Sequence, residues 1–379
     1  MKLICKGVVT IAVLMANAPT LAAQQPAKWR LVEEWRVGGE VEGPHSFTDV
    51  RGLAVFADGR IVVLDAKDQK LHILGADGKP MRTVGRKGAG PGEMSDANGV
   101  LVSPRGEIIV NDPQGNNRFT LYSSSGDFVK TIPMTNLWGY GYVWSAYFNS
   151  AGLLDEYVSV RKGGDAQSTP ARRVWSLDFS RIDTVMPPAC ALADRPDPDN
   201  LRFRFVNASG GTTMLIPNAS PGTPVATASD GAGWAGTFPG YATIRRTPAG
   251  KCEGDVSIQL KGARIAVPSA TRDSDVVRVQ QAAARRGMTA DVSKIPREYP
   301  AYDALYVDPA QRLWVERYTD RPGRRLEIFS NRGVQIAELD TPMVFRRSPA
   351  PVVTNERILA FVSDEDGLAY LVSLRIVRN

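Results

Sequence analysis

The sequence predicts an all-β fold, a six-bladed β-propeller of four-stranded antiparallel blades with one short helical insertion. Two observations carry this prediction. A repeat of 47 residues aligns Gly52 with Gly99, and tight-turn sequences divide each repeat into short apolar runs. A period in the forties with several short strands per unit is typical of propeller blades.

The first repeat contains four predicted strands, at 52–57, 60–66, 70–76 and 79–85. Reversals at Asp58-Gly59 and Asp77-Gly78 separate the first strand from the second and the third from the fourth. Asp-Gly between apolar runs favours a tight hairpin because glycine accepts a positive φ without a steric penalty. This unit is therefore predicted to be the first blade.

The second repeat keeps the same turns and predicts strands at 99–102, 107–111, 118–122 and 128–132. Its residues Val110-Asn111-Asp112, Asn116 to Phe119 and Gly126 resemble the NHL repeat. The linker Gly85 to Met94, with the later residues Ile295-Pro296 through Asp308 and Leu313-Trp314-Val315, is similar to a six-bladed propeller group found among exported bacterial proteins. The resemblance is strongest over 49–134, moderate over 295–342 and faint in between.

The remaining blades are placed by spacing. Turns at 149–152 and 230–231 mark the third and fourth blades, 301–342 supplies the fifth, and 352–378 supplies three strands of the sixth. An apolar-rich strand at about 29–37 is predicted to provide the missing outer strand and to close the ring, which would leave no exposed sheet edge. Residues 24–379 are thus expected to form a single domain.

Two segments depart from the repeat. Residues 187–224 are rich in Pro, Asn, Gly and Ser and are expected to form long loops. Residues 274–286 are expected to form an amphipathic helix, with Ser274 as its cap and Asp275 in its first turn. We expect this helix to lie over one end of the ring, either as part of a binding surface or as a structural cover.

Residues 1–23 have the pattern of a cleaved signal peptide. Lys2 and Lys6 precede an apolar stretch from Gly7 to Ala18, which is followed by small residues up to Ala23. We therefore expect a periplasmic or secreted protein without a transmembrane span. The two cysteines beyond this segment, Cys190 and Cys252, are expected to form a disulfide, with two separate thiols as the alternative.

The charge pattern does not favour nucleic acid. The chain has 46 basic and 40 acidic residues, and its arginine pairs are scattered along the sequence instead of forming one stripe. The partner class expected instead is a protein, a peptide or a glycan.

The search for catalytic motifs is mostly negative. His45 and His72 are the only histidines, so one chain cannot form a three-histidine metal centre, which argues against zinc-dependent peptide-amidating lyases of similar fold. His72 is interpreted as an ordinary strand residue and His45 as a loop residue. Neither a G-x-S-x-G elbow nor an H-E-x-x-H motif is present. No catalytic residue is assigned.

The favoured function is a non-catalytic binding or scaffold module without a cofactor. Its candidate binding residues are Asp49, Arg51, Asn98, Tyr140, Tyr142, Trp144 and Asp303. The alternative is a calcium-dependent lactonase or esterase that uses the central channel. Calcium prefers carboxylate and amide oxygens, and the candidate ligands by blade position are Asp49, Asn98 and Asp303. Arg51 would place a positive charge close to the same axis.

Overall fold

The computed structural model describes residues 25–378 except 41–42, 44, 135–143, 161–168, 189–201, 207–211, 221–224 and 238–239. The predicted signal peptide, Tyr140, Tyr142 and Cys190 lie outside the described residues. Within this part of the chain, no helix has the length and apolar character needed to cross a membrane.

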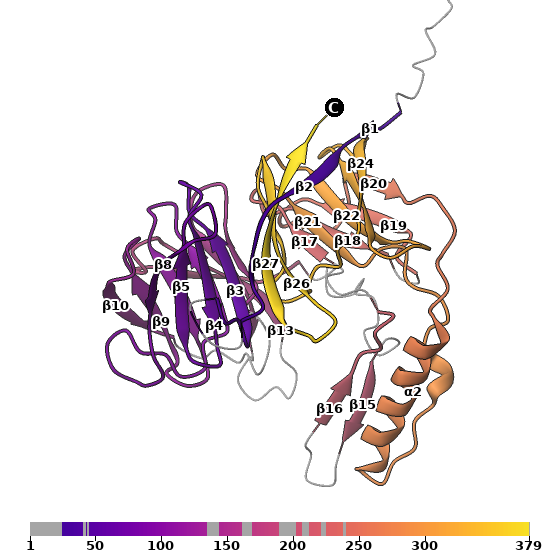
Figure 1. Cartoon of the computed structure of the whole chain (residues 1–379), viewed down its shortest axis with the longest axis horizontal. Coiled ribbons are helices and arrows are strands. Elements are labelled where there is room, and N and C mark those ends of the chain that lie inside the picture. Colours follow the sequence, from indigo (N-terminus) through magenta and orange to yellow (C-terminus); the bar gives the residue numbers. More distant parts are fainter. Residues whose placement is uncertain are drawn as a thin grey trace, which may run out of the picture.

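The chain is a six-bladed propeller of four-stranded antiparallel sheets, as predicted (Figure 1). The first blade comprises β3 (Val50–Val55), β4 (Ile61–Asp65), β5 (Lys70–Leu74) and β6 (Pro80–Val84). The second comprises β7 (Gly99–Val102), β8 (Ile108–Asp112), β9 (Arg118–Tyr122) and β10 (Phe128–Pro133). The third comprises β11 (Ala146–Phe148), β12 (Leu154–Val160), β13 (Thr169–Trp175) and β14 (Ile182–Val185).

The fourth blade comprises β17 (Val225–Thr227), β18 (Gly233–Gly236), β19 (Thr243–Thr247) and β20 (Val256–Gln259). The fifth comprises β21 (Ala304–Val307), β22 (Leu313–Tyr318), β23 (Arg324–Phe329) and β24 (Gln335–Thr341), and β1 (Ala27–Lys28) adds a short parallel strand to β24. The sixth comprises β25 (Val352–Val353), β26 (Arg357–Ser363) and β27 (Ala369–Val377), with β2 (Arg30–Gly38) antiparallel to β27. The first and last parts of the chain therefore share one sheet.

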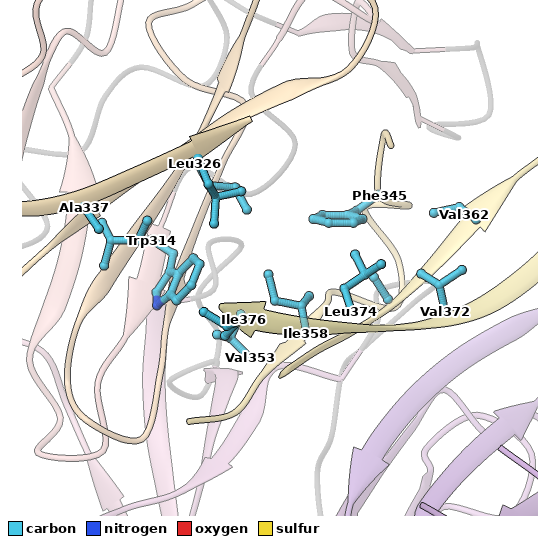
Figure 2. Packing of buried hydrophobic residues seen from close by; sticks show 13 residues of the cluster. Trp314, Leu326, Ala337, Phe345, Val353, Ile358, Val362, Val372, Leu374 and Ile376 are labelled. Carbon is cyan, nitrogen blue, oxygen red and sulfur yellow. The ribbon is translucent and has the colours of Figure 1, made fainter. Parts of the chain in front are cut away.

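The core lies between the blades: among the described residues, buried apolar clusters join blades one and two, two and three, four and five, five and six, and six and one. Figure 2 shows the interface of blades five and six, where Trp314 and Leu326 of blade five face Ile358 and Leu374 of blade six. Between blades one and two, a Cβ at Gly52 would lie 2.6 Å from Val100 Cγ1. Glycine is needed here because the inner strands approach closely.

The two departures from the repeat combine into one projecting unit. Residues expected to be loop contain a hairpin, β15 (Phe203–Val206) and β16 (Thr212–Leu215), which corrects the prediction for 187–224. The helix α2 spans Ser269–Ala284, and the short helix η2 spans Val292–Lys294. Figure 1 shows β15, β16 and α2 standing out from the ring together.

The prediction for the helix was wrong in three respects. The helix begins five residues before Ser274, after Pro268, and no side chain caps it. Asp275 is fully buried in the second turn instead of lying in the first turn. The helix packs on Phe203 and Phe205 through Val279 and Ala283, so it covers the hairpin and not the blades.

Candidate functional site

The inserted unit and those predicted binding residues that the structure describes share one end of the propeller. At this end, called the loop face here, the outer strand of each blade connects to the inner strand of the next. The hairpin lies in the connection from β14 to β17, and α2 lies in the connection from β20 to β21. Three predicted binding residues immediately precede an inner strand, namely Asp49, Asn98 and Asp303, and Trp144 lies two residues before one. The candidate site is therefore the mouth of the channel on the loop face.

Two aspartates, one repeat apart, hold the first two blade entries in position. Asp65 accepts hydrogen bonds from the backbone N–H of Thr48 at 2.7 Å and of Asp49 at 3.2 Å. Asp112 accepts equivalent bonds at 2.8 Å from the residues one repeat later, Ser95 and Asp96. Both aspartates end the second strand of their blade and are buried. Asp49 and Asp96 consequently occupy matching places at the mouth.

Arg51 joins these two places. Its guanidinium lies 2.9 Å from Asp49 Oδ2 and 2.8 Å from Asp96 Oδ1. Burial acts to lower the pKa of Arg51, but the hydrogen bonds that it donates to both carboxylates raise it overall. The positive charge expected near the axis is thus already paired with two carboxylates. The sequence reasoning missed Asp96, although the 47-residue period places it at the position equivalent to Asp49.

Asn98 and Trp144 lie where blades two and three meet. Asn98 Oδ1 accepts a hydrogen bond of 2.7 Å from Asn111, and the Trp144 backbone N–H donates to the Asn98 carbonyl at 3.2 Å. The Trp144 ring packs at 5.5 Å from Phe119, and its Nε1–H donates to Glu156 at 2.9 Å. These contacts give both residues a packing role between the blades.

Asp303 lies among cationic and phenolic groups at the entry to blade five. Its carboxylate is nearly buried and accepts hydrogen bonds from Arg347 at 2.7 Å and Tyr318 at 2.9 Å, with Arg324 at 3.5 Å. Burial acts to lower the pKa of Arg347, but the charge of Asp303 raises it overall. Arg324 also lies over the Tyr318 ring, 4.6 Å from its centroid.

The Asp303 cluster also anchors the inserted unit. Arg347 donates to the Ser220 carbonyl at 3.2 Å, and that residue follows the hairpin. Asn218 in the same segment donates through its backbone and side chain to Asp275 of α2, at 2.8 and 3.0 Å. Arg347 therefore connects the channel mouth to the hairpin and the helix.

The histidines lie away from any ligand cluster. His72 is buried in β5 beside Phe47 and Thr83, and burial lowers its pKa. His45 lies 3.3 Å from the Gly78 carbonyl and 3.6 Å from Glu40. Among the described residues, no group of three or more His, Cys, Asp or Glu side chains is placed to hold a metal. Asp49 and Asp303 are both engaged by arginines, and the structure records no contact between them.

A hollow lies at the join of blades three and four. It has a volume of about 230 Å³ and is lined mainly by apolar groups of Tyr157, Met186, Pro187, Pro188 and Pro248. The blades are tied there by polar contacts, including 2.9 Å between the hydroxyls of Tyr157 and Thr227. This hollow was not foreseen from the sequence.

Comparison with known proteins supports the propeller class. The sequence model of a family described as "6-bladed beta-propeller" matches residues 50–138. This segment spans the first two blades, where the repeat is most regular. A search of curated proteins by sequence gives no significant match.

Solved structures extend the likeness to most of the chain. A putative exported protein from Bacteroides fragilis is 12% identical with a TM-score of 0.50, covering 92% of this chain and 95% of its own. A DUF4221 family member from Bacteroides vulgatus is 12% identical with a TM-score of 0.48, covering 94% and 100%. An inactive virginiamycin B lyase from Staphylococcus aureus, crystallised with quinupristin, is 14% identical with a TM-score of 0.44, covering 89% and 99%. At these identities the likeness is one of fold.

Proposed function

We propose that this protein is an exported, non-catalytic binding module that takes a protein, peptide or glycan at the mouth of its channel. The observation that carries the proposal is the arrangement of charges there. Arg51 bridges Asp49 and Asp96 across two blades, and Arg347 and Arg324 surround Asp303. Partly exposed groups of both signs are thereby fixed before any ligand arrives, which lowers the entropic cost of binding.

Export rests on residues 1–23, whose charged start, apolar stretch and small-residue end have the form of a signal peptide. Expression of the full chain with its native start, followed by N-terminal sequencing of the protein in the envelope fraction, tests this. A mature N-terminus at residue 23 or 24 supports export. An intact Met1 in the cytoplasm contradicts it.

A Cys190–Cys252 disulfide belongs to the same proposal. Met186 to Pro188, which lead towards Cys190, line one hollow with Thr247 to Lys251, which lead into Cys252. A bridge would close a loop of about 63 residues, for which chain entropy gives about 4 kcal/mol. Peptide mapping of the purified protein without reductant should recover the linked pair. Recovery of two alkylated thiols would contradict it.

The binding site itself is tested with residues 24–379 on peptide and glycan arrays and in capture from envelope extract. Arg51→Met keeps the length of the side chain and removes its charge at the mouth. Arg105→Met is the matched control, because Arg105 is exposed in the β7–β8 turn at the opposite end of the propeller. A ligand held by the wild type and Arg105→Met but lost by Arg51→Met supports the proposal. A ligand held equally by all three proteins, or turnover of an ester or lactone panel, overturns it.

A further inference from the structure

The inserted unit contains a groove separate from the channel mouth. The groove has a volume of about 370 Å³ and lies between the end of β16 and one flank of α2. Its lining residues are Leu215, Arg278, Gln281, Ala282, Arg285 and Arg286. Three of these six side chains are cationic and none is acidic.

The carboxylate that pairs with one of these arginines is already committed. Asp275 is fully buried and accepts hydrogen bonds from Asn218 and, at 2.6 Å, from Arg278. Arg278 donates a second hydrogen bond, of 2.7 Å, to the Ile216 carbonyl just after β16. Among the described residues, Arg285 makes no side-chain hydrogen bond or ion pair, and it is exposed. Its charge is therefore open to an external anion.

The position of the arginines makes such a cluster tolerable. Arg285 and Arg286 follow the last residue of α2, where the helix dipole favours positive charge. Three guanidinium groups can therefore share one groove at little cost to the fold. They still repel one another, so an anionic ligand would relieve that repulsion.

The strand beside the groove offers a second kind of contact. β15 and β16 form a two-stranded sheet, and among the described residues no third strand pairs with β16. An unpaired edge presents backbone N–H and C=O groups that an added strand can satisfy. Met214 and Ile216 expose apolar side chains along the same segment, at 44% and 45%.

We propose that this groove binds an extended, acidic peptide segment of a partner protein. The segment pairs with the outer edge of β16 and directs its carboxylates to Arg278, Arg285 and Arg286. Four residues of β16 span about 13 Å, and Arg278 and Arg285 lie about 10 Å apart along the helix. An extended peptide of four to six residues thus covers both the edge and the arginines. This ligand differs from a simple anion because it must both pair with the strand edge and bring carboxylates to the arginines.

The experiment measures binding of a fluorescent Thr-Glu-Thr-Glu-Thr-Glu peptide to residues 24–379 by anisotropy. The expected result is saturable binding that weakens with salt, because exposed charges are screened. Arg285→Glu should weaken it at least tenfold, whereas Arg105→Glu, an equal charge change in the β7–β8 turn, should leave it unchanged. Circular dichroism checks that both variants keep their fold.

Two further probes separate the contacts. The same peptide with alternate backbone nitrogens methylated should lose binding, because methylation removes the N–H groups that pair with a strand edge. A Thr-Lys peptide should not bind. Equal binding of the methylated peptide, an equal affinity for oligogalacturonate, or an Arg285→Glu variant that matches Arg105→Glu would each overturn the proposal. Arg51→Met changes the channel mouth and not the groove. A failure of the channel-mouth proposal is therefore distinguishable from a failure of this one.

Discussion

Glu156 in blade three and Glu316 in blade five occupy the same place in their blades and are held differently. Each lies on the second strand, opposite an alanine of the first strand, and each is 2% exposed. Glu156 accepts two indole N–H bonds, from Trp144 at 2.9 Å and Trp175 at 2.8 Å. Glu316 accepts one hydroxyl bond, from Tyr306 at 2.6 Å, and faces Arg324 at 3.5 Å.

The comparison shows that the repeat sets the position of a buried carboxylate while the neighbouring residues set its ionisation. Burial raises the pKa of both side chains, and raises that of Glu316 to about 7. The nearby charge of Asp303 adds to the rise at Glu316, whereas the two indoles oppose the rise at Glu156. Blade five therefore carries a titratable group near neutrality beside the channel mouth.

The largest expected effect concerns Asp303, which compensates the cations of blade five. Asp303→Ala removes the carboxylate that Arg324, Arg347 and Tyr318 share, and breaking a buried charge pair costs about 3–5 kcal/mol. Urea unfolding should show that loss for the alanine variant and a smaller one for Asp303→Asn, which keeps an acceptor. Equal stability of Asp303→Ala and wild type would show that this cluster does not hold blade five together.

The next effect is a pH dependence of the free energy of unfolding that Glu316 should cause. Its folded pKa of about 7 lies above the unfolded value of about 4.5, so the folded state binds the proton more tightly between these values. The contribution of protonated Glu316 to the free energy of unfolding is fully present below pH 4.5. It should be lost as pH rises from 4.5 through 7, a fall of at most about 3 kcal/mol. Urea unfolding at pH 5 and pH 8 should show this fall in the wild type and in Glu356→Gln, an exposed control, but not in Glu316→Gln. Parallel profiles for all three proteins would refute the assignment.

A smaller effect is expected when Glu156 loses one of its indole donors. Trp144→Phe removes the N–H while keeping an aromatic ring, and a lost bond to a charged group costs about 1.5–3 kcal/mol. Trp29→Phe is the matched control, because Trp29 is a partly buried tryptophan whose side chain, among the described residues, makes ring contacts with Trp314 and two arginines but no hydrogen bond. Thermal unfolding should therefore place Trp144→Phe below Trp29→Phe. The reverse order would mean that ring packing outweighs the hydrogen bond.

The smallest effect is expected from calcium. Asp49 and Asp303 already pair with arginines, so calcium would have to displace Arg51 or Arg347 before binding. The unfolding midpoint should be the same with excess calcium and with chelator. Because a ligand of the folded state must raise stability, a calcium-dependent rise that Asp49→Ala abolishes would instead favour the lactonase alternative.

The regular repeat made the first two blades readable from sequence. Asp-Gly turns and apolar alternation act locally, so the predicted strands of blades one and two agree with β3 to β10 within a few residues. The hairpin β15–β16 was missed because its four-residue strands lie among loop-forming residues. The alternation of Phe203 and Phe205 with polar neighbours was the available indication.

The candidate site was less readable, because its contacts join residues far apart in the chain. Sequence position named Asp49, Arg51, Asn98 and Asp303 but gave none of their partners. Arg347 is 44 residues from Asp303, and Asn218 is 57 residues from Asp275. Such pairs depend on how blades and insertions pack, and no local pattern encodes them.

The sequence by itself determined the propeller class and the number of blades, because strand alternation and turn chemistry are properties of neighbouring residues. Only the tertiary structure decided which charges meet. Packing blade two on blade one brings Asp49 and Asp96 to one arginine, and packing α2 on the hairpin creates the arginine groove. The physical reason is that burial and ion pairing depend on distances between segments that only the folded chain brings together.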